Sequence, residues 1–193
     1  MTNTYRVRPA ALSDMSAIID LIDSSARWLQ TYKSTDQWAR PWPNRKERDT
    51  RISRGIVGGS TWMVESNAGL VGTITYRDKG NPHLWTGYEL REPAVYVSRL
   101  IVSRQHASQG IGAALIDWAG MRARDTWAAH WIRVDVWTTN LALHEYYKGQ
   151  GFEHLRTLEF EHYWDYPSAA LFQKPTSAVD MTRAAWFEQE EVS

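Results

Sequence analysis

The segment SRQHASQGIGAALIDWAG, Ser103 to Gly120, indicates both the fold class and the place of a binding site. It puts two glycines, Gly110 and Gly112, where a loop turns into an alanine-rich apolar helix. Glycine costs about 1 kcal/mol relative to alanine inside a helix, so its presence here needs a reason. Backbone N–H groups at a helix N-terminus bind phosphate, and glycine keeps them accessible while tolerating unusual backbone angles. A tight strand-to-helix turn with close packing is the alternative, and spacing alone does not separate the two.

Two common nucleotide-binding motifs do not fit this loop. A P-loop needs a lysine followed by serine or threonine after its last glycine, whereas Ala113 and Ala114 follow Gly112. A dinucleotide-binding fingerprint needs a third glycine, and Leu115 occupies that position. If the loop binds an anion, it does so in another way.

Composition narrows the class of protein. The 193 residues include 22 lysines and arginines and 22 aspartates and glutamates, a formal net charge of zero that argues against a nucleic-acid or membrane partner. The absence of cysteine excludes disulfides, thiolate zinc sites and a cysteine nucleophile, and we expect no metal. No apolar run is long enough for a membrane span, and the first residues lack the layout of a signal peptide, so we expect a cytoplasmic protein.

Strand and helix patterns alternate along the chain and predict one α/β domain with a mixed sheet of about seven strands and about four helices. Its central strand is AVYVSRLIV, Ala94 to Val102, whose apolar and β-branched residues are typical of a strand buried on both faces. We assign residues 1–175 to this domain and residues 176–193 to a tail that is either loose or holds a short helix. Eleven tryptophans, several of them in predicted loops, indicate an aromatic-lined pocket.

A second motif lies downstream in DVWTTNLALHEYYKGQGF, residues 135–152. Asn140 and Tyr147 are seven residues apart, about two helical turns, so their side chains face the same way. Each residue also has an ordinary alternative role. Asn140 fits a helix cap and Tyr147 fits a packing residue.

Together the two motifs resemble the acyl-CoA site of the GNAT superfamily of N-acyltransferases. The first GNAT signature is a strand ending in valine, then R/Q-x-x-G-x-G/A at the start of a long helix, matched by Val102, Gly110 and Gly112. The second is an asparagine that opens a helix and a tyrosine four residues before Gly-Phe, matched by Asn140, Tyr147, Gly151 and Phe152. The chain departs from the family at the R/Q position, where Ala107 stands and Arg104 is the nearby positive charge.

The resemblance implies transfer of an acetyl group from acetyl-CoA to a primary amine of a small molecule, by direct attack in a ternary complex. A main-chain N–H between Leu100 and Val102 would stabilise the thioester oxygen. Tyr147 would protonate the leaving thiolate, since a phenol pKa of about 10 lies near a thiol pKa of about 8.5. The implied cofactor-binding residues are Leu100, Ile101, Val102, Ala107, Ser108, Gln109, Gly110, Ile111, Gly112, Ala113, Asn140 and Tyr147.

The resemblance leaves the general base and the acceptor pocket open. Many relatives carry a carboxylate on the central strand four residues before its final valine, where this chain has Ser98. Glu92 is our first substitute, with Glu89 and His83 behind it, so the predicted catalytic residues are Tyr147, Asn140 and Glu92. The acceptor is expected beside the first two helices and their loop, which offer Trp28, Gln37, Trp38 and Trp42. The predicted substrate-binding residues are Trp28, Gln37, Trp38 and, on the central strand, Ser98.

Two alternatives remain open. Ala107 at the R/Q position fits another acyl donor, either a longer acyl-CoA or an aminoacyl-tRNA. The missing strand carboxylate fits a non-catalytic acyl-CoA-binding regulatory module. The sequence fixes neither the acceptor amine nor the oligomeric state, for which a homodimer is one option.

Overall fold

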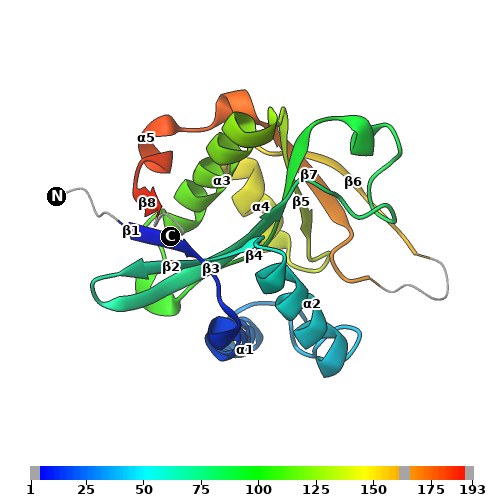
Figure 1. The fold of residues 1–193 in the computed structure, drawn as a ribbon. Helices are drawn as coiled ribbons and strands as arrows, with labels where there is room; N and C mark the ends of the chain where they lie inside the picture. Colours follow the sequence, from blue (N-terminus) through cyan, green and yellow to red (C-terminus); the bar gives the residue numbers. More distant parts are fainter. Residues whose placement is uncertain (1–4, 161–165, 190–193) are drawn as a thin grey trace.

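The computed structural model describes residues 5–160 and 166–189. All of its strands form one sheet of order β6-β7-β5-β4-β3-β2-β1-β8 (Figure 1). The strands and α-helices, in chain order, are β1 (Tyr5–Pro9), α1 (Met15–Tyr32), α2 (Arg45–Val57), β2 (Thr61–Ser66), β3 (Gly69–Arg77), β4 (Ala94–Val102), α3 (Ile111–Trp127), β5 (Trp131–Val136), α4 (Leu141–Gly149), β6 (Glu153–Thr157), β7 (Ala170–Pro175), α5 (Met181–Ala184) and β8 (Phe187–Gln189).

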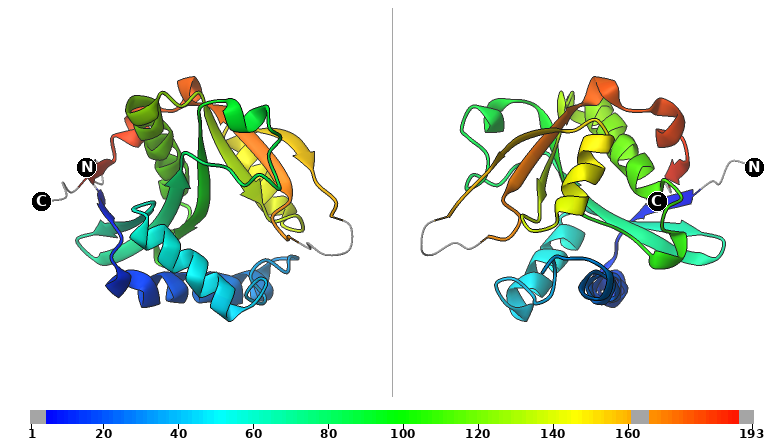
Figure 2. Two further views of the ribbon diagram at one scale, coloured as in Figure 1. Left: turned by 45° about the vertical axis from the view of Figure 1, so that its right-hand side comes forward. Right: turned by 180° about the vertical axis from the view of Figure 1, so that it is seen from behind.

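Helices cover both faces of the sheet (Figures 1 and 2). On one face α1 and α2 bury Ile18 and Ile52 in a cluster that also contains Met63 of β2. On the other face α3 and α4 contribute Leu115 and Tyr147 to the main core cluster. The single domain with a mixed sheet that the sequence predicts is therefore confirmed.

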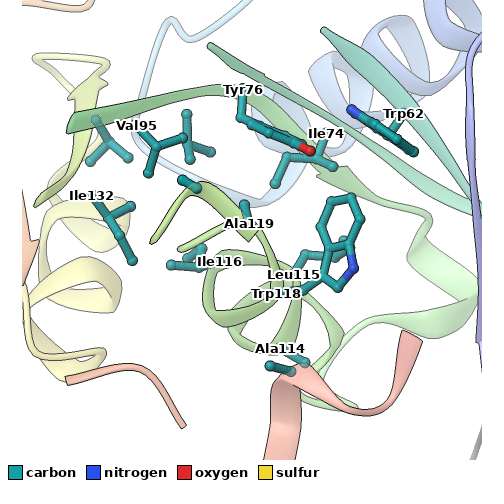
Figure 3. Packing of buried hydrophobic residues seen from close by; sticks show 14 of the residues in the cluster. Trp62, Ile74, Tyr76, Val95, Ala114, Leu115, Ile116, Trp118, Ala119 and Ile132 are labelled. Atoms are coloured by element: carbon teal, nitrogen blue, oxygen red, sulfur yellow. The ribbon is translucent and has the colours of Figure 1, made fainter. Parts of the chain in front are cut away.

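Helix α3 fits against the sheet because its buried stripe is built from small residues alternating with large ones. Leu115 and Ala119 are fully buried, and Trp118 packs edge-on against Trp62 at 5.5 Å between ring centroids (Figure 3). A Cβ added at Gly120 would lie 2.4 Å from Cδ1 of Ile132 and 2.9 Å from Cγ1 of Val179, so a larger residue would have to displace these packed side chains between α3 and β5.

The two central strands separate halfway along their length. Parallel pairing of β4 with β5 runs from Ala94–Trp131 to Val97–Val134, although β4 continues to Val102. The register of β4 against β3 shifts in the same stretch, and Arg99 there has a left-handed φ of 46°. The expectation that β4 is buried on both faces is wrong for its second half, because the separated strands leave that half partly exposed.

The end of the chain, for which the sequence left a loose tail or a short helix open, holds a short helix and also a strand that was not expected. Its helical part is confined to Met181–Ala184, and Phe187–Gln189 forms β8, which pairs in parallel with β1. This strand brings the sheet to eight strands instead of about seven. A strand of three residues is too short to show a hydrophobic period, which is why sequence analysis missed it.

Asp117 of α3 ties the end of the chain to the domain. Its carboxylate is buried and lies 3.0 Å from Nζ of Lys174 on β7 and 2.7 Å from the guanidinium of Arg183 on α5. Within the described ranges, no helix is both long enough and apolar enough to cross a bilayer.

Candidate active site

A cavity of about 1160 Å³ opens where β4 and β5 separate. Its walls come from the α1–α2 loop, α2, β3, β4, the glycine loop and α4. The structure therefore gathers residues from both sequence motifs around one space. The predicted site residues that line it are Gln37, Trp38, Ser98, Leu100, Val102, Ala107, Ser108, Gly110, Ile111, Gly112 and Tyr147.

Six predicted residues do not line the cavity. Ile101 and Ala113 point into the protein and are 4% and 5% exposed, and the Gln109 side chain faces solvent. The other three, Trp28, Asn140 and Glu92, have partners elsewhere that are described below.

The glycine loop and the start of α3 carry a row of backbone N–H groups beside the cavity, which Ser108 and residues 110–112 of this row line. Within residues 5–160 and 166–189, the N–H groups of Ser108, Gln109 and Gly110 donate no hydrogen bond. The next three N–H groups, of Ile111–Ala113, open α3 and have no partner inside a helix. Six successive donors at the positive end of a helix dipole form a site for a phosphate or diphosphate.

The two glycines serve different geometric purposes. Gly110 has a φ of 78°, a conformation that side chains disfavour, and Ser108 also turns through the left-handed region with a φ of 63°. Gly112 has a different reason, because a Cβ there would lie 3.0 Å from the hydroxyl of Tyr146. Tyr146, which the sequence analysis passed over for its neighbour, therefore packs beside the row of amides and lines the cavity.

Tyr147 lines the same cavity from α4, and its ring packs against Phe152 at 5.2 Å between centroids. Burial raises the pKa of Tyr147 above its ordinary value, so the phenol stays protonated across the physiological range. Among the described residues its hydroxyl donates to no acceptor, which leaves its proton available to a ligand. Because the pKa is raised, a strong hydrogen bond to a thiolate is favoured over complete proton transfer.

Asn140 acts as the cap of α4 and also holds a loop in place. Its Oδ1 accepts from the N–H of Leu143 at 3.0 Å, and its Nδ2 donates to Oε1 of Gln37 at 2.5 Å. Asp36 in the same loop accepts from Nε1 of Trp137 at 2.8 Å. Asn140 therefore positions Tyr147 and the α1–α2 loop from outside the cavity.

Trp28 lies beneath the side chain of Arg104, whose guanidinium carbon is 3.7 Å from the centre of the indole ring. Arg104 itself lines the cavity in the short 3-10 turn Arg104–His106 that leads into the glycine loop. The contact links α1 to this turn, so Trp28 supports a cationic side chain beside the glycine loop.

The structure does not bring Glu92 to the cavity. Glu92 accepts a hydrogen bond from the buried guanidinium of Arg133 and is committed to that ion pair. Glu89 is held by Arg156 at 2.7 Å, and this contact lowers the pKa of Glu89 to about 2. Of the three substitute bases, only His83 lines the cavity.

Asp135, which the sequence analysis did not select, lines the inner end of the cavity near the end of β5. Its Oδ2 accepts from the hydroxyl of Tyr166 at 2.8 Å, and burial raises the pKa of its carboxyl above the ordinary value. The alternation Arg133, Asp135, Trp137 against apolar neighbours was the available signal, because a charged residue inside a central strand needs a partner. Across residues 5–160 and 166–189, no group of three or more His, Asp and Glu side chains is placed to hold a metal ion.

The chain is similar to acetyltransferases in sequence and in fold. It is 28% identical over 148 residues to the uncharacterized N-acetyltransferase YesJ of Bacillus subtilis strain 168, covering 75% of this chain and 79% of that protein. The crystal structure of a GNAT-family acetyltransferase from Listeria monocytogenes 4b F2365 is 26% identical, with a TM-score of 0.68 over 89% of this chain and 94% of that one. A chimera of the Vibrio cholerae spermidine N-acetyltransferase SpeG with hSSAT shares the fold at 16% identity, with a TM-score of 0.56 over 90% and 96% of the two chains.

A family model described as the acetyltransferase (GNAT) family matches residues 24–152. This stretch contains the glycine loop, both tyrosines of α4 and the two strands that separate around the cavity. The sequence, the fold and the row of free amides agree, and the chain belongs to the GNAT family of acetyltransferases.

Proposed function

We propose that the protein transfers the acetyl group of acetyl-CoA to a primary amine of a small molecule, by direct attack in a ternary complex. One observation carries this proposal. In the amide row, Ser108 and residues 110–112 line one cavity, and the hydroxyl-bearing face of α4 and the carboxylate of Asp135 line the same cavity. The donor and the acceptor can therefore meet without a covalent enzyme intermediate, and the chain contains no cysteine to form one by thioester exchange.

The amides of the glycine loop hold the diphosphate of acetyl-CoA in this proposal. Backbone donors alone supply these hydrogen bonds, so alanine in place of the family's R/Q side chain at Ala107 leaves them intact. Arg104, stacked on Trp28, adds a positive charge beside the loop. The substrate supplies a thioester, which is already activated toward attack by an amine.

The separated half of β4 provides the electrostatic stabilisation. Beyond Val97 this strand no longer pairs with β5, so main-chain N–H groups between Leu100 and Val102 lie at the cavity edge. One of them would donate to the carbonyl oxygen as it gains negative charge. Tyr147 would donate a hydrogen bond to the thiolate sulfur as the carbon–sulfur bond breaks.

In this proposal the general base is Asp135, in place of Glu92. An alkylammonium has a pKa of about 10 and cannot attack until it loses a proton. The carboxylate of Asp135 would pair with the ammonium and take one proton, which leaves a neutral amine whose lone pair attacks the thioester carbon. The nitrogen would lose its second proton as the carbon–sulfur bond breaks, and the departing thiolate would be protonated to the free CoA thiol. Its raised pKa brings it closer to that of the amine, which improves the transfer.

Release of free CoA thiol from acetyl-CoA, measured with a panel of primary amines, tests the proposal. We expect turnover with at least one small amine and binding of CoA by calorimetry without any amine. Absence of CoA binding would contradict the proposal. Binding without turnover on any amine, or turnover only with a longer acyl-CoA, would instead support one of the two alternatives drawn from the sequence.

A further inference from the structure

The cavity carries a charge that the chain as a whole does not. The protein has equal numbers of basic and acidic residues, but nine arginine and lysine side chains and only three carboxylates line this space. A surplus of this size concentrated around one cavity attracts anions and repels cations. Part of this positive charge would neutralise the phosphates of CoA, and the rest is free to attract another anion.

Three arginines lie at the end of the cavity away from the glycine loop. Arg51 comes from α2, Arg77 from the end of β3, and Arg99 from the bulged part of β4. Arg99 donates to Oγ1 of Thr75 at 3.4 Å and to the backbone oxygen of Arg51 at 3.3 Å. The guanidinium of Arg51 stacks over Trp42 at 5.2 Å from the ring centre.

These three guanidiniums lack the carboxylate partners that arginines elsewhere in the fold possess. Arg48 pairs with Asp23 at 3.1 Å, and Arg156 pairs with Glu89 at 2.7 Å. In the part of the chain that the structure describes, no carboxylate lies within ion-pair distance of Arg51, Arg77 or Arg99. Arg51 also donates to the backbone oxygen of Trp42, and Arg51 and Arg99 bond otherwise to neutral oxygens, so these cavity-lining guanidiniums keep a charge that matches a carboxylate or phosphate.

Electrostatic repulsion among Arg51, Arg77 and Arg99 also favours an anion at this end of the cavity. Burial, with the added charges of Arg77 and Arg51, lowers the pKa of Arg99 to about 10. Burial is the largest cause of this lowered pKa, and the attraction of Asp135 offsets only part of it. A bound anion would remove that penalty.

The same end of the cavity also holds the carboxylate of Asp135. Asp135 interacts electrostatically with Arg77 and Arg99 and accepts a hydrogen bond from Tyr166. Trp42 packs edge-on against Tyr166 at 4.9 Å, which closes this end with aromatic rings. A site for an ammonium therefore lies beside a site for an anion.

We propose that the acceptor is a primary amine that also carries an anionic group, a carboxylate or a phosphate, held by Arg51, Arg77 and Arg99 while Asp135 receives the amine. This inference rests on the proposed acetyl transfer and names the substrate class of that site. An anionic acceptor would distinguish this protein from a polyamine acetyltransferase, because the arginine cluster would repel a polycation.

Matched acceptor pairs test the inference. We would measure acetyl-CoA thiol release with β-alanine against β-alaninamide, with O-phosphoethanolamine against ethanolamine, and with spermidine. The anionic member of at least one pair should have a kcat/KM at least about tenfold higher, since a charge-assisted hydrogen bond contributes that much. Turnover of neutral amines or spermidine at equal or higher efficiency would overturn the inference while leaving acetyl transfer established.

Two arginines of α2 provide a matched control. Arg51→Gln should raise KM for the anionic acceptor about tenfold or more and leave KM for its neutral partner within twofold. Arg54→Gln removes the same charge one turn along the helix, from an exposed position outside the cavity, and should change neither KM. Equal effects of the two substitutions would show that general charge, not the cluster, matters.

A binding measurement decides the inference if no amine in the panel is acetylated. Calorimetry with N-acetyl-β-alanine and its amide compares product analogues that differ only in the anionic group. Tighter binding of the acid, lost in Arg51→Gln and Arg77→Gln, would support the anion site independently of turnover. Equal binding of acid and amide would overturn it.

Discussion

Substitution of alanine for Gly112 separates the binding role of the glycine loop from its role in the fold. The added Cβ would lie 3.0 Å from the hydroxyl of Tyr146 and 3.9 Å from Cγ2 of Val102. The hydroxyl ends a side chain that can shift by a few tenths of an ångström, at a cost of about 0.5–1.5 kcal/mol. Alanine is favoured over glycine in a helix by up to about 1 kcal/mol. We therefore expect a change of less than about 1 kcal/mol in the free energy of unfolding.

The effect of Gly112→Ala on CoA binding should be much larger. The methyl group would lie beside the first amides of α3 and push against Tyr146. If these amides bind the diphosphate as proposed, at least one of its oxygens would lose its N–H partner. A hydrogen bond to a charged group contributes about 1.5–3 kcal/mol. Its loss corresponds to a Kd for CoA that rises about 10- to 100-fold.

Gly149→Ala is the matched control for this variant. Gly149 ends α4, and a Cβ there would meet no heavy atom within 4 Å. We expect equal or higher stability, by up to about 1 kcal/mol, and an unchanged Kd. Urea unfolding and calorimetric titration with CoA measure both quantities. An unchanged Kd in Gly112→Ala, or a stability loss of more than about 3 kcal/mol, would refute the reasoning.

Three further outcomes follow from the site and its support. Tyr147→Phe should lower kcat about 100-fold while KM for acetyl-CoA stays within twofold, and steady-state kinetics with an unchanged kcat would remove Tyr147 from the mechanism. Asp135→Asn should abolish acetyl transfer and yet raise the free energy of unfolding at pH 7, because the raised pKa of Asp135 means that its ionised form is disfavoured in the fold. Urea unfolding should show this gain in stability shrinking as the pH falls toward 4, where the carboxyl of the parent protein becomes protonated. A gain that stays constant with pH would contradict the raised pKa. Asp117→Ala leaves Lys174 buried without its counter-ion and should cost about 3–5 kcal/mol by urea unfolding, whereas a cost below about 1 kcal/mol would show that the pair does not stabilise α5.

Local sequence patterns predicted the strands and helices that are determined by residues close together in the chain. The apolar run Ala94–Val102 is a strand with those bounds, and the glycine loop opens α3 as its sequence indicates. The structure differs from the prediction where contacts between residues far apart in the sequence determine the strand pairing. Separation of β4 from β5 depends on a bulge at Arg99, and no periodicity in either strand reports it.

The candidate site likewise combines residues of continuous motifs with residues that only the fold brings together. Spacing found the amide row and Tyr147, because both belong to continuous motifs. Glu92 lies next to β4 along the chain but pairs with Arg133 across the sheet, a contact that its position in the sequence does not indicate. Asp135 and the arginine cluster come from separate strands and a helix, so only the fold brings them together.

A crystal structure with CoA bound tests the central claim most directly. We expect diphosphate oxygens within about 3.2 Å of backbone nitrogens of residues 108–113, and the sulfur beside the hydroxyl of Tyr147 between β4 and β5. A diphosphate bound away from these amides, or a sulfur that Tyr147 cannot reach, would contradict the account.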